Sequence, residues 1–247
     1  MPDTADSLPS RVADIYERHP HQHHILPYIG DALVTPTDDD LRVLTVGINS
    51  CVSEKDWPPK PEWHRDWIED RTYPFQRGVL DEAAVLAQAV VQAPSFRGKR
   101  YEEPRCIYAT NAVKIYVPET RGKRAANLND RDLAAHEKQW RDELALLAEV
   151  GAMPHVVIVF SRVHWPYAWQ AFHPKHGGPA LAVTRFVPVT GDAPHRMNRI
   201  TLKHEGREHA LLLVRLRHPA GRGKVGTANW LCERAAFRQA LRSAIEV

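Results

Sequence analysis

The segment HVVIVF, residues 155–160, constrains the fold more than any other part of the chain. Its five consecutive apolar residues, three of them valine, predict a β-strand that is covered on both faces, as in a parallel sheet. The preceding residues predict a long helix, from about 130 to 150, with Asn129 suited to its N-cap and Gly151 to its end. The apolar residues of this helix share one face: Leu133, Trp140, Leu144 and Leu147.

Further elements are expected on both sides of this segment. Short apolar runs predict strands at residues 42–46, 106–110 and 210–216. Apolar residues at helical spacing predict helices over residues 79–92 and about 230–245. Residues 161–208 are rich in His, Pro and Trp and predict irregular structure. Because strands alternate with helices, we expect a three-layer α/β/α fold around a central, mostly parallel sheet.

Length and composition bound the class of protein. The chain has 247 residues, 43% hydrophobic and 26% charged, which excludes collagen-like and wholly disordered proteins. We expect one domain over residues 41–247, preceded by a polar extension over residues 1–40 with a short helix at about 10–18. The net charge of +3 allows a nucleic-acid partner without requiring one.

No sequence feature predicts a membrane protein or a metal site. No apolar run reaches the roughly 20 residues of a membrane span, and no secretory signal is visible, so we expect a cytoplasmic protein with no membrane partner. The three cysteines form no CxxC motif, which favours reduced thiols. The tract HPHQHH, residues 19–24, has no spaced acidic or cysteine partners and is more typical of a solvated segment. We therefore expect neither metal nor cofactor.

Polar residues follow several of the predicted strands. GINS at residues 47–50 follows the first strand, TNAVK at 110–114 the second, and HPA at 218–220 the last. Ligands of open parallel sheets bind beyond the carboxyl ends of the strands, so these residues are candidates for a site. Each motif alone is also typical of an ordinary turn. The chain has no Walker loop, GxSxG, HExxH or dinucleotide-binding motif.

The order of these motifs is more specific than any one of them. GIN, a PF pair, TNAVK, a long helix, VIVF and HP together resemble the uracil-DNA glycosylase superfamily over roughly residues 42–245. In that family a GEAPG or GINPG motif follows the first strand, and a PF pair, a TNxVK-like segment and an HPS motif follow in turn. The stretch YPFQRGVLDEA, residues 73–83, is similar to the family's PFxGxxGxLLDE stretch. The resemblance implies the family's fold and excision of a base from DNA.

The resemblance also implies a role for each matching residue. Asn49 positions or activates the attacking water, and His218 stabilises negative charge on the leaving base. Phe75 stacks on the flipped base, and Asn111 hydrogen-bonds its edge. The remaining residues implied at the base are Gly47, Ile48, Ser50 and Tyr73. The implied DNA contacts are Lys114, Arg222 and Lys224, the last two in a loop over residues 220–226 that enters the groove.

The chain departs from the family pattern at several positions. Ser50 stands where GINPG has proline, and Ala220 replaces the serine of HPS. Ile115 and the scarcity of cysteine remove the ligands of the family's iron–sulfur members, so no cluster is expected. Two aromatic-rich loops either pack down on the protein or line a widened pocket for a bulky base; they contain Trp57, Trp63, Trp67, Trp165, Tyr167 and Trp169, with His64, His164, His173 and His176 as candidate donors.

We therefore expect a monomeric, monofunctional DNA glycosylase that leaves an abasic site. A neutral Asn49 can orient water but offers no carboxylate to the sugar cation, which implies slower catalysis or a base that leaves easily. The candidate bases are uracil and a modified pyrimidine, such as the glucosylated hydroxymethylcytosine of phage DNA. Two other hypotheses stay open: a non-catalytic nucleic-acid-binding protein on the same scaffold, and a metal-dependent hydrolase that uses the His-rich segments.

Overall fold

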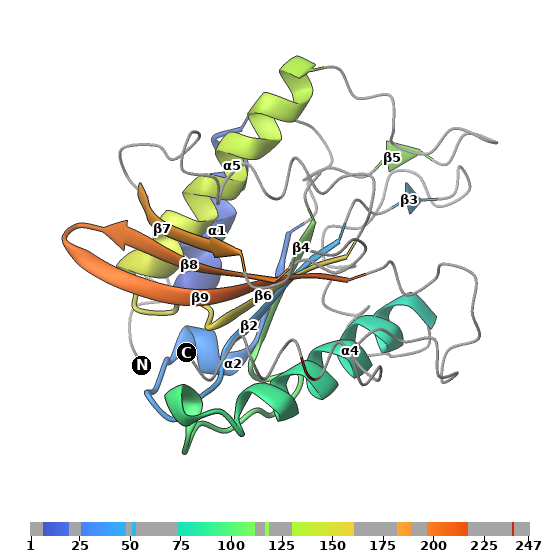
Figure 1. The fold of residues 1–247 in the computed structure, drawn as a ribbon. Helices are drawn as coiled ribbons and strands as arrows, with labels where there is room; N and C mark the ends of the chain where they lie inside the picture. The colour runs from blue at the N-terminus through green and yellow to red at the C-terminus, as the bar shows by residue number, and fades with distance from the viewer. Residues whose placement is uncertain are drawn as a thin grey trace.

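The computed structural model of the chain has a seven-stranded sheet with helices packed on both faces (Figure 1). The structure describes residues 7–19, 26–47, 51–52, 74–111, 117–118, 130–160, 182–188 and 197–216, together with Gln239. The helices are α1 (Leu8–Glu17), α2 (Asp31–Val34), α4 (Pro74–Val90) and α5 (Asp130–Glu149), with a short 3-10 helix η3 (Pro94–Phe96). The strands are β1 (Tyr28–Ile29), β2 (Val43–Gly47), β3 (Cys51–Val52), β4 (Ile107–Asn111), β5 (Val117–Pro118), β6 (Val156–Phe160), β7 (Ala182–Pro188), β8 (Met197–His204) and β9 (Arg207–Leu216).

The centre of the sheet is parallel, as the sequence predicts. The strand order is β1-β4-β2-β6-β9-β8-β7, and β4, β2, β6 and β9 pair in parallel. β1 and β8 run against these strands, and β7 runs with them because it is antiparallel to β8. All five residues of β6 are buried, which confirms the expected doubly covered strand. The α/β class and the three layers are therefore confirmed.

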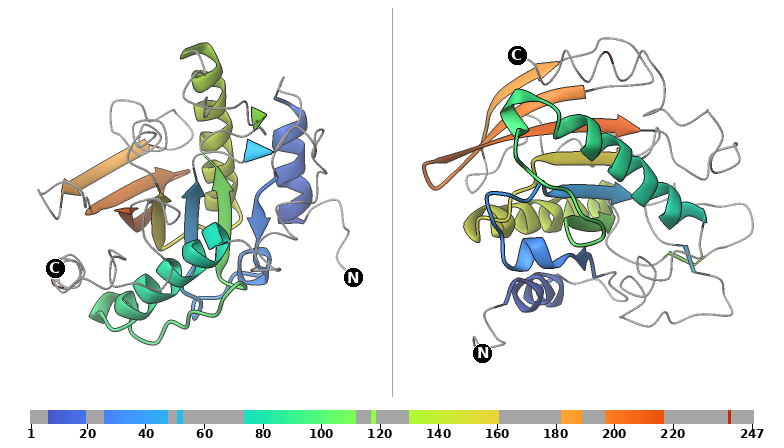
Figure 2. Two further views of the ribbon diagram at one scale, coloured as in Figure 1. Left: turned by 90° about the vertical axis from the view of Figure 1, so that its right-hand side faces the viewer. Right: turned by 90° about the horizontal axis from the view of Figure 1, so that it is seen from below.

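Alternate side chains of the sheet enter two separate apolar cores. Leu44 and Val46 pack on one face with residues of α1 and α5, whereas Val43 packs on the other face with residues of α4. Figure 2 shows α5 and α1 on one side of the sheet and α4 on the other. Within α5, the predicted apolar residues Trp140, Leu144 and Leu147 are all buried in the first core.

The region from 161 to 208, predicted to be irregular, contains two strands, and that prediction is wrong for residues 182–188 and 197–204. β8 and β9 form a hairpin whose turn residues, Glu205 and Gly206, have φ angles of 45° and 84°. Two positive φ angles match the twist of a tight hairpin, and glycine adopts one of them without strain. The Glu-Gly pair, between the alternating residues of MNRITLKH and REHALLL, is the signal that the sequence interpretation missed.

The ends of the helices follow local sequence rules. α5 ends at Glu149, two residues before the predicted stop at Gly151, whose φ is 73°, and the amide of Ala152 donates to the Leu147 carbonyl at 2.8 Å. This is the Schellman arrangement, in which a left-handed residue satisfies the last free carbonyls of a helix. α4 begins at Pro74, five residues before the predicted start, because proline fits the first helical turn even without apolar periodicity. The predicted N-cap Asn129 and the predicted helix at about 230–245 lie outside the described residues, apart from Gln239.

The described part of residues 1–40 packs against the rest of the fold. Val12, Ile15 and Tyr16 of α1 are buried in the core that α5 shares with the sheet. β1 adds an antiparallel strand to the edge of β4. The predicted short helix at residues 10–18 thus corresponds to α1, which is amphipathic and capped by the Ser7 hydroxyl.

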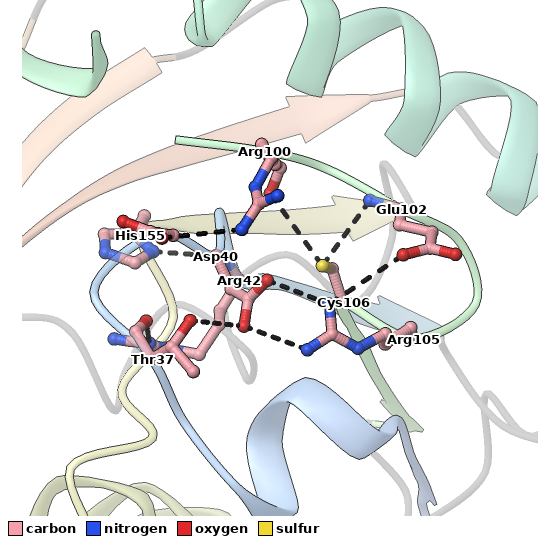
Figure 3. A network of polar contacts seen from close by, with 9 residues as sticks. Thr37, Asp40, Arg42, Arg100, Glu102, Arg105, Cys106 and His155 are labelled. Atoms are coloured by element: carbon pink, nitrogen blue, oxygen red, sulfur yellow. Dashed lines mark hydrogen bonds and ion pairs between the residues drawn. The ribbon is translucent and has the colours of Figure 1, made fainter. Parts of the chain in front are cut away.

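A polar network joins the loops at the amino ends of the central strands (Figure 3). Asp40 is buried and accepts hydrogen bonds from both terminal nitrogens of Arg105, at 3.1 and 3.3 Å, and from the Thr37 hydroxyl at 2.7 Å. The Arg42 side chain donates to the carbonyls of Met153 and Thr37. Because these groups are mutually satisfied, the network supports the sheet rather than offering free groups to a ligand.

The His155 ring belongs to this network as a neutral acceptor. Its Nδ1 atom accepts the backbone amide of Arg42 at 3.0 Å. Burial, together with the positive charges of Arg42 and Lys99, lowers the pKa of His155 from 6.5 to about 3. The unfolded chain therefore binds a proton below pH 6.5 that the folded protein refuses until about pH 3.

We predict that unfolding free energy falls as pH drops from 6.5 toward 3, and that His155→Gln makes this fall shallower. The reason is that glutamine can accept the Arg42 amide without titrating. Urea denaturation at pH 7, 5.5 and 4.5 measures the two slopes. Equal slopes for the wild type and the variant would show that other groups cause the acid sensitivity.

Candidate functional site

The carboxyl ends of the four parallel strands lie at one edge of the sheet and are in register. Gly47, the last residue of β2, pairs with Asn111, the last residue of β4. On the other side, Phe160 ends β6 and pairs with Leu216, which ends β9. The chain segments that follow all four strands therefore start at the same level, which is where open parallel sheets bind ligands.

Gly47 and Asn111 are in close contact across this edge. The Asn111 side chain is 5% exposed, and its Oδ1 atom occupies the space that a Cβ atom on Gly47 would need. Only glycine leaves room for that amide at this register position. The close approach brings together residues of the GINS and TNAVK motifs, which the sequence predicts for the site.

A second strand pair brackets the segments that leave β2 and β4. β3 and β5 pair in parallel, with Cys51 opposite Val117. Residues 48–50 therefore lie between Gly47 and Cys51, and residues 112–116 lie between the partners of these two residues, Asn111 and Val117. These short segments contain Asn49 and Lys114, whose own positions lie outside the described residues.

The PF pair lies at the start of α4. Pro74 and Phe75 are the first two residues of the helix. Figure 2 shows that the helix begins toward the end of the sheet to which the arrowheads of the central strands point. Asn111 lies on the α4 face of β4, since Ile107 and Ala109 of the same strand pack in the α4 core. The structure therefore brings Gly47 and Asn111 together, and α4 begins toward the same end of the sheet.

The other predicted site residues lie outside the described residues. They are Ile48, Asn49, Ser50, Tyr73, Lys114, His218, Arg222 and Lys224. The aromatic and histidine candidates of the two long loops, from Trp57 to Trp67 and from His164 to His176, lie outside them too. The assignment of these residues to a site remains a prediction.

A buried carboxylate on the opposite face was not predicted. Glu143 of α5 has no exposed surface, and it accepts the hydroxyl groups of Tyr16 at 2.8 Å, Tyr108 at 2.9 Å and Thr110 at 3.3 Å. Burial raises the pKa of Tyr16 and of Tyr108, and the Glu143 charge raises both further, so the hydroxyls stay protonated and donate. The available signal was spacing: Glu143 follows Trp140 by three residues and precedes Leu147 by four, on the apolar face.

Within the described ranges, the chemistry of this edge is that of neutral amides and hydroxyls. No group of three His, Cys, Asp or Glu residues in these ranges is arranged to hold a metal ion. In the same part of the chain, no helix has the length and apolarity needed to cross a bilayer. A neutral amide such as that of Asn111 presents one donor group and one acceptor group to a ligand edge.

Comparison with known proteins adds no family assignment. No protein-family model matches the chain, and no curated protein is significantly similar to it.

We predict that Gly47→Ala destabilises the protein by about 1–3 kcal/mol, because the new methyl group overlaps the Asn111 amide. Without that overlap, replacing glycine within a strand by alanine is expected to stabilise it. In an Asn111→Ala background the cost should shrink or change sign. Urea denaturation of the four proteins of this cycle gives the coupling energy, and additivity within about 0.5 kcal/mol would rule out the proposed contact.

We predict that Glu143→Ala lowers the unfolding free energy by about 3 kcal/mol or more, because three buried hydroxyls lose a charged acceptor. Glu149→Ala is the matched control, since it lies on the same helix and is 51% exposed beside Arg11. It should cost less than about 1 kcal/mol. A similar small cost for both variants in urea denaturation would contradict the role of Glu143.

Proposed function

We propose that the protein is a DNA glycosylase that hydrolyses the N-glycosidic bond of an extruded pyrimidine base and leaves an abasic site. The observation that supports this most is the close pairing of Gly47 with Asn111 at the carboxyl edge of the sheet. It joins the GIN and TNAVK motifs, which are far apart in sequence, at the place where ligands of such sheets bind. A mostly parallel sheet with helices on both faces is compatible with the proposal.

The strand ends are spaced suitably for a single nucleobase. β6 alone separates β2 from β9, so the ends of β2 and β9 are about 10 Å apart at ordinary strand spacing. Asn49 follows the last residue of β2 by two positions, and His218 follows the last residue of β9 by two. The two segments that carry the proposed catalytic residues therefore begin on either side of β6, at a separation comparable to the size of a pyrimidine.

The proposed reaction uses these groups in one displacement at the sugar. Phe75 stacks on the extruded base, and this contact offsets part of the cost of unstacking it from the duplex. Asn111 hydrogen-bonds the base edge. The bond between the sugar C1′ and the base nitrogen breaks, and the base leaves with the electron pair. A water oriented by Asn49 forms the new bond at C1′, and the proton that this water loses ends on the departing base anion, which is released as the neutral base. His218 donates a hydrogen bond to the negative charge that develops on the base before it is protonated.

The finer assignments follow the resemblance. We propose that Lys114, Arg222 and Lys224 contact phosphate and that the protein acts as a cytoplasmic monomer with DNA as its partner. The base is uracil or a modified pyrimidine, of which glucosylated hydroxymethylcytosine is the bulkiest considered. The alternative is a non-catalytic binder of nucleic acid on the same scaffold, because the neutral Asn49 offers no carboxylate to the sugar and Ala220 replaces the serine of HPS.

We predict that the purified protein releases a base from DNA in the presence of EDTA, and that Asn49→Ala and His218→Ala abolish the release. End-labelled oligonucleotides carrying uracil, hydroxymethylcytosine or its glucosylated form, single- and double-stranded, report cleavage after alkali treatment. Asn49→Asp should accelerate release, because a carboxylate stabilises the sugar cation as the neutral amide cannot. An Arg97→Ala variant, altered at the opposite end of α4 beyond η3, should retain the wild-type rate.

Two results would overturn the proposal. Salt-dependent DNA binding without release of any base would favour the non-catalytic binder. Release that disappears in EDTA and returns with a divalent metal would favour the metal-dependent hydrolase.

A further inference from the structure

Gln139 of α5 is a buried amide without a hydrogen-bond partner. Its side chain has no exposed surface, and neither its Oε1 nor its Nε2 atom is bonded within the described part of the chain. Buried polar groups in native proteins are nearly always satisfied, and one that is not costs stability. An amide retained in this state needs a partner of another kind, such as a water or a ligand.

Gln139 lies near the level at which β4 ends. One turn further along α5, Glu143 accepts the Thr110 hydroxyl, and Thr110 precedes Asn111 in β4. The exposed face of α5, from Lys138 to Glu149, lines a surface groove that also contains His204 of β8. α5 contacts β8 and runs diagonally across the sheet (Figure 1), and Gln139 precedes Glu143 by one helical turn, toward the amino end of the helix.

We propose that the Gln139 amide is a second hydrogen-bonding group for the extruded base and a determinant of which base is accepted. This inference rests on the proposed function. Asn111 approaches the edge from the α4 face of the sheet and Gln139 from the α5 face, so a base beyond the strand ends stands between them. One donor and one acceptor on each amide match the alternating donors and acceptors along a pyrimidine edge.

The Glu143 cluster explains why Gln139 is held in place. Glu143 ties α5 to β4 through Tyr108 and Thr110, and to α1 through Tyr16. A side chain one turn away on the same helix face is thereby fixed relative to the strand that carries Asn111. A rigid, desolvated amide loses little entropy when it binds a base, which favours discrimination between bases.

The test compares stability with activity in Gln139→Leu. Replacing an unpartnered buried amide by an apolar residue of similar size should leave the melting temperature unchanged or raise it. Excision of the preferred base should nevertheless fall at least ten-fold, with Gln139→Met as a second variant should the leucine protein not fold. Gln139→Glu, which offers mainly acceptors, should shift the ratio of excision toward bases with an exocyclic amino group and away from uracil.

Asn198→Leu is the matched control. Asn198 is also buried with an unpartnered Nδ2 atom, but β8 lies four strands from β4, so its replacement should leave excision unchanged. Full excision by Gln139→Leu, with or without lost stability, would overturn the inference while leaving the proposed function intact. Absence of excision by the wild type would overturn both.

Discussion

The buried Glu143 carboxylate is the interaction on which the packing of α1 and α5 against β4 depends. A fully buried charge is tolerated only when hydrogen bonds replace the water it has lost, and here Tyr16, Tyr108 and Thr110 supply them. Those three donors come from α1 and β4, so one side chain of α5 joins three elements that are distant in sequence. Two of the three donors, Tyr108 and Thr110, belong to β4, so the carboxylate holds that strand against α5.

The two edges of the sheet serve different purposes. At the amino edge, Asp40, Arg105 and Arg42 satisfy one another and the adjoining loops, and the His155 ring is held neutral. At the carboxyl edge, the Asn111 amide lies across Gly47, and we propose that the buried Gln139 amide serves the same edge. The amino-edge network is satisfied within the fold, whereas the carboxyl edge is where open α/β sheets bind ligands.

The core of the fold was predictable from local pattern. Continuous apolar runs at β2, β4 and β6 and the 3.6-residue period of α5 are short-range properties, and they led to the correct layers. β7 and β8 were missed because charged positions such as Arg199 and Lys203 interrupt their apolar residues and because the Glu-Gly turn signal was overlooked. Such strands are stabilised by pairing with β9 across the Glu205–Gly206 turn, which is a tertiary contribution. The early start of α4 was missed because Pro74 and Phe75 carry no periodicity of their own.

The amino-acid sequence by itself determined the α/β class, the central parallel strands and the order of motifs on which the proposed function rests. Only the tertiary structure decided that Gly47 and Asn111 are in contact, because register between strands separated by more than 60 residues is not encoded in either segment alone. The same holds for Glu143 and Gln139, which read in the sequence as ordinary polar residues of an amphipathic helix. Their burial depends on the direction in which α5 crosses the sheet, and that direction is set by packing of the whole face.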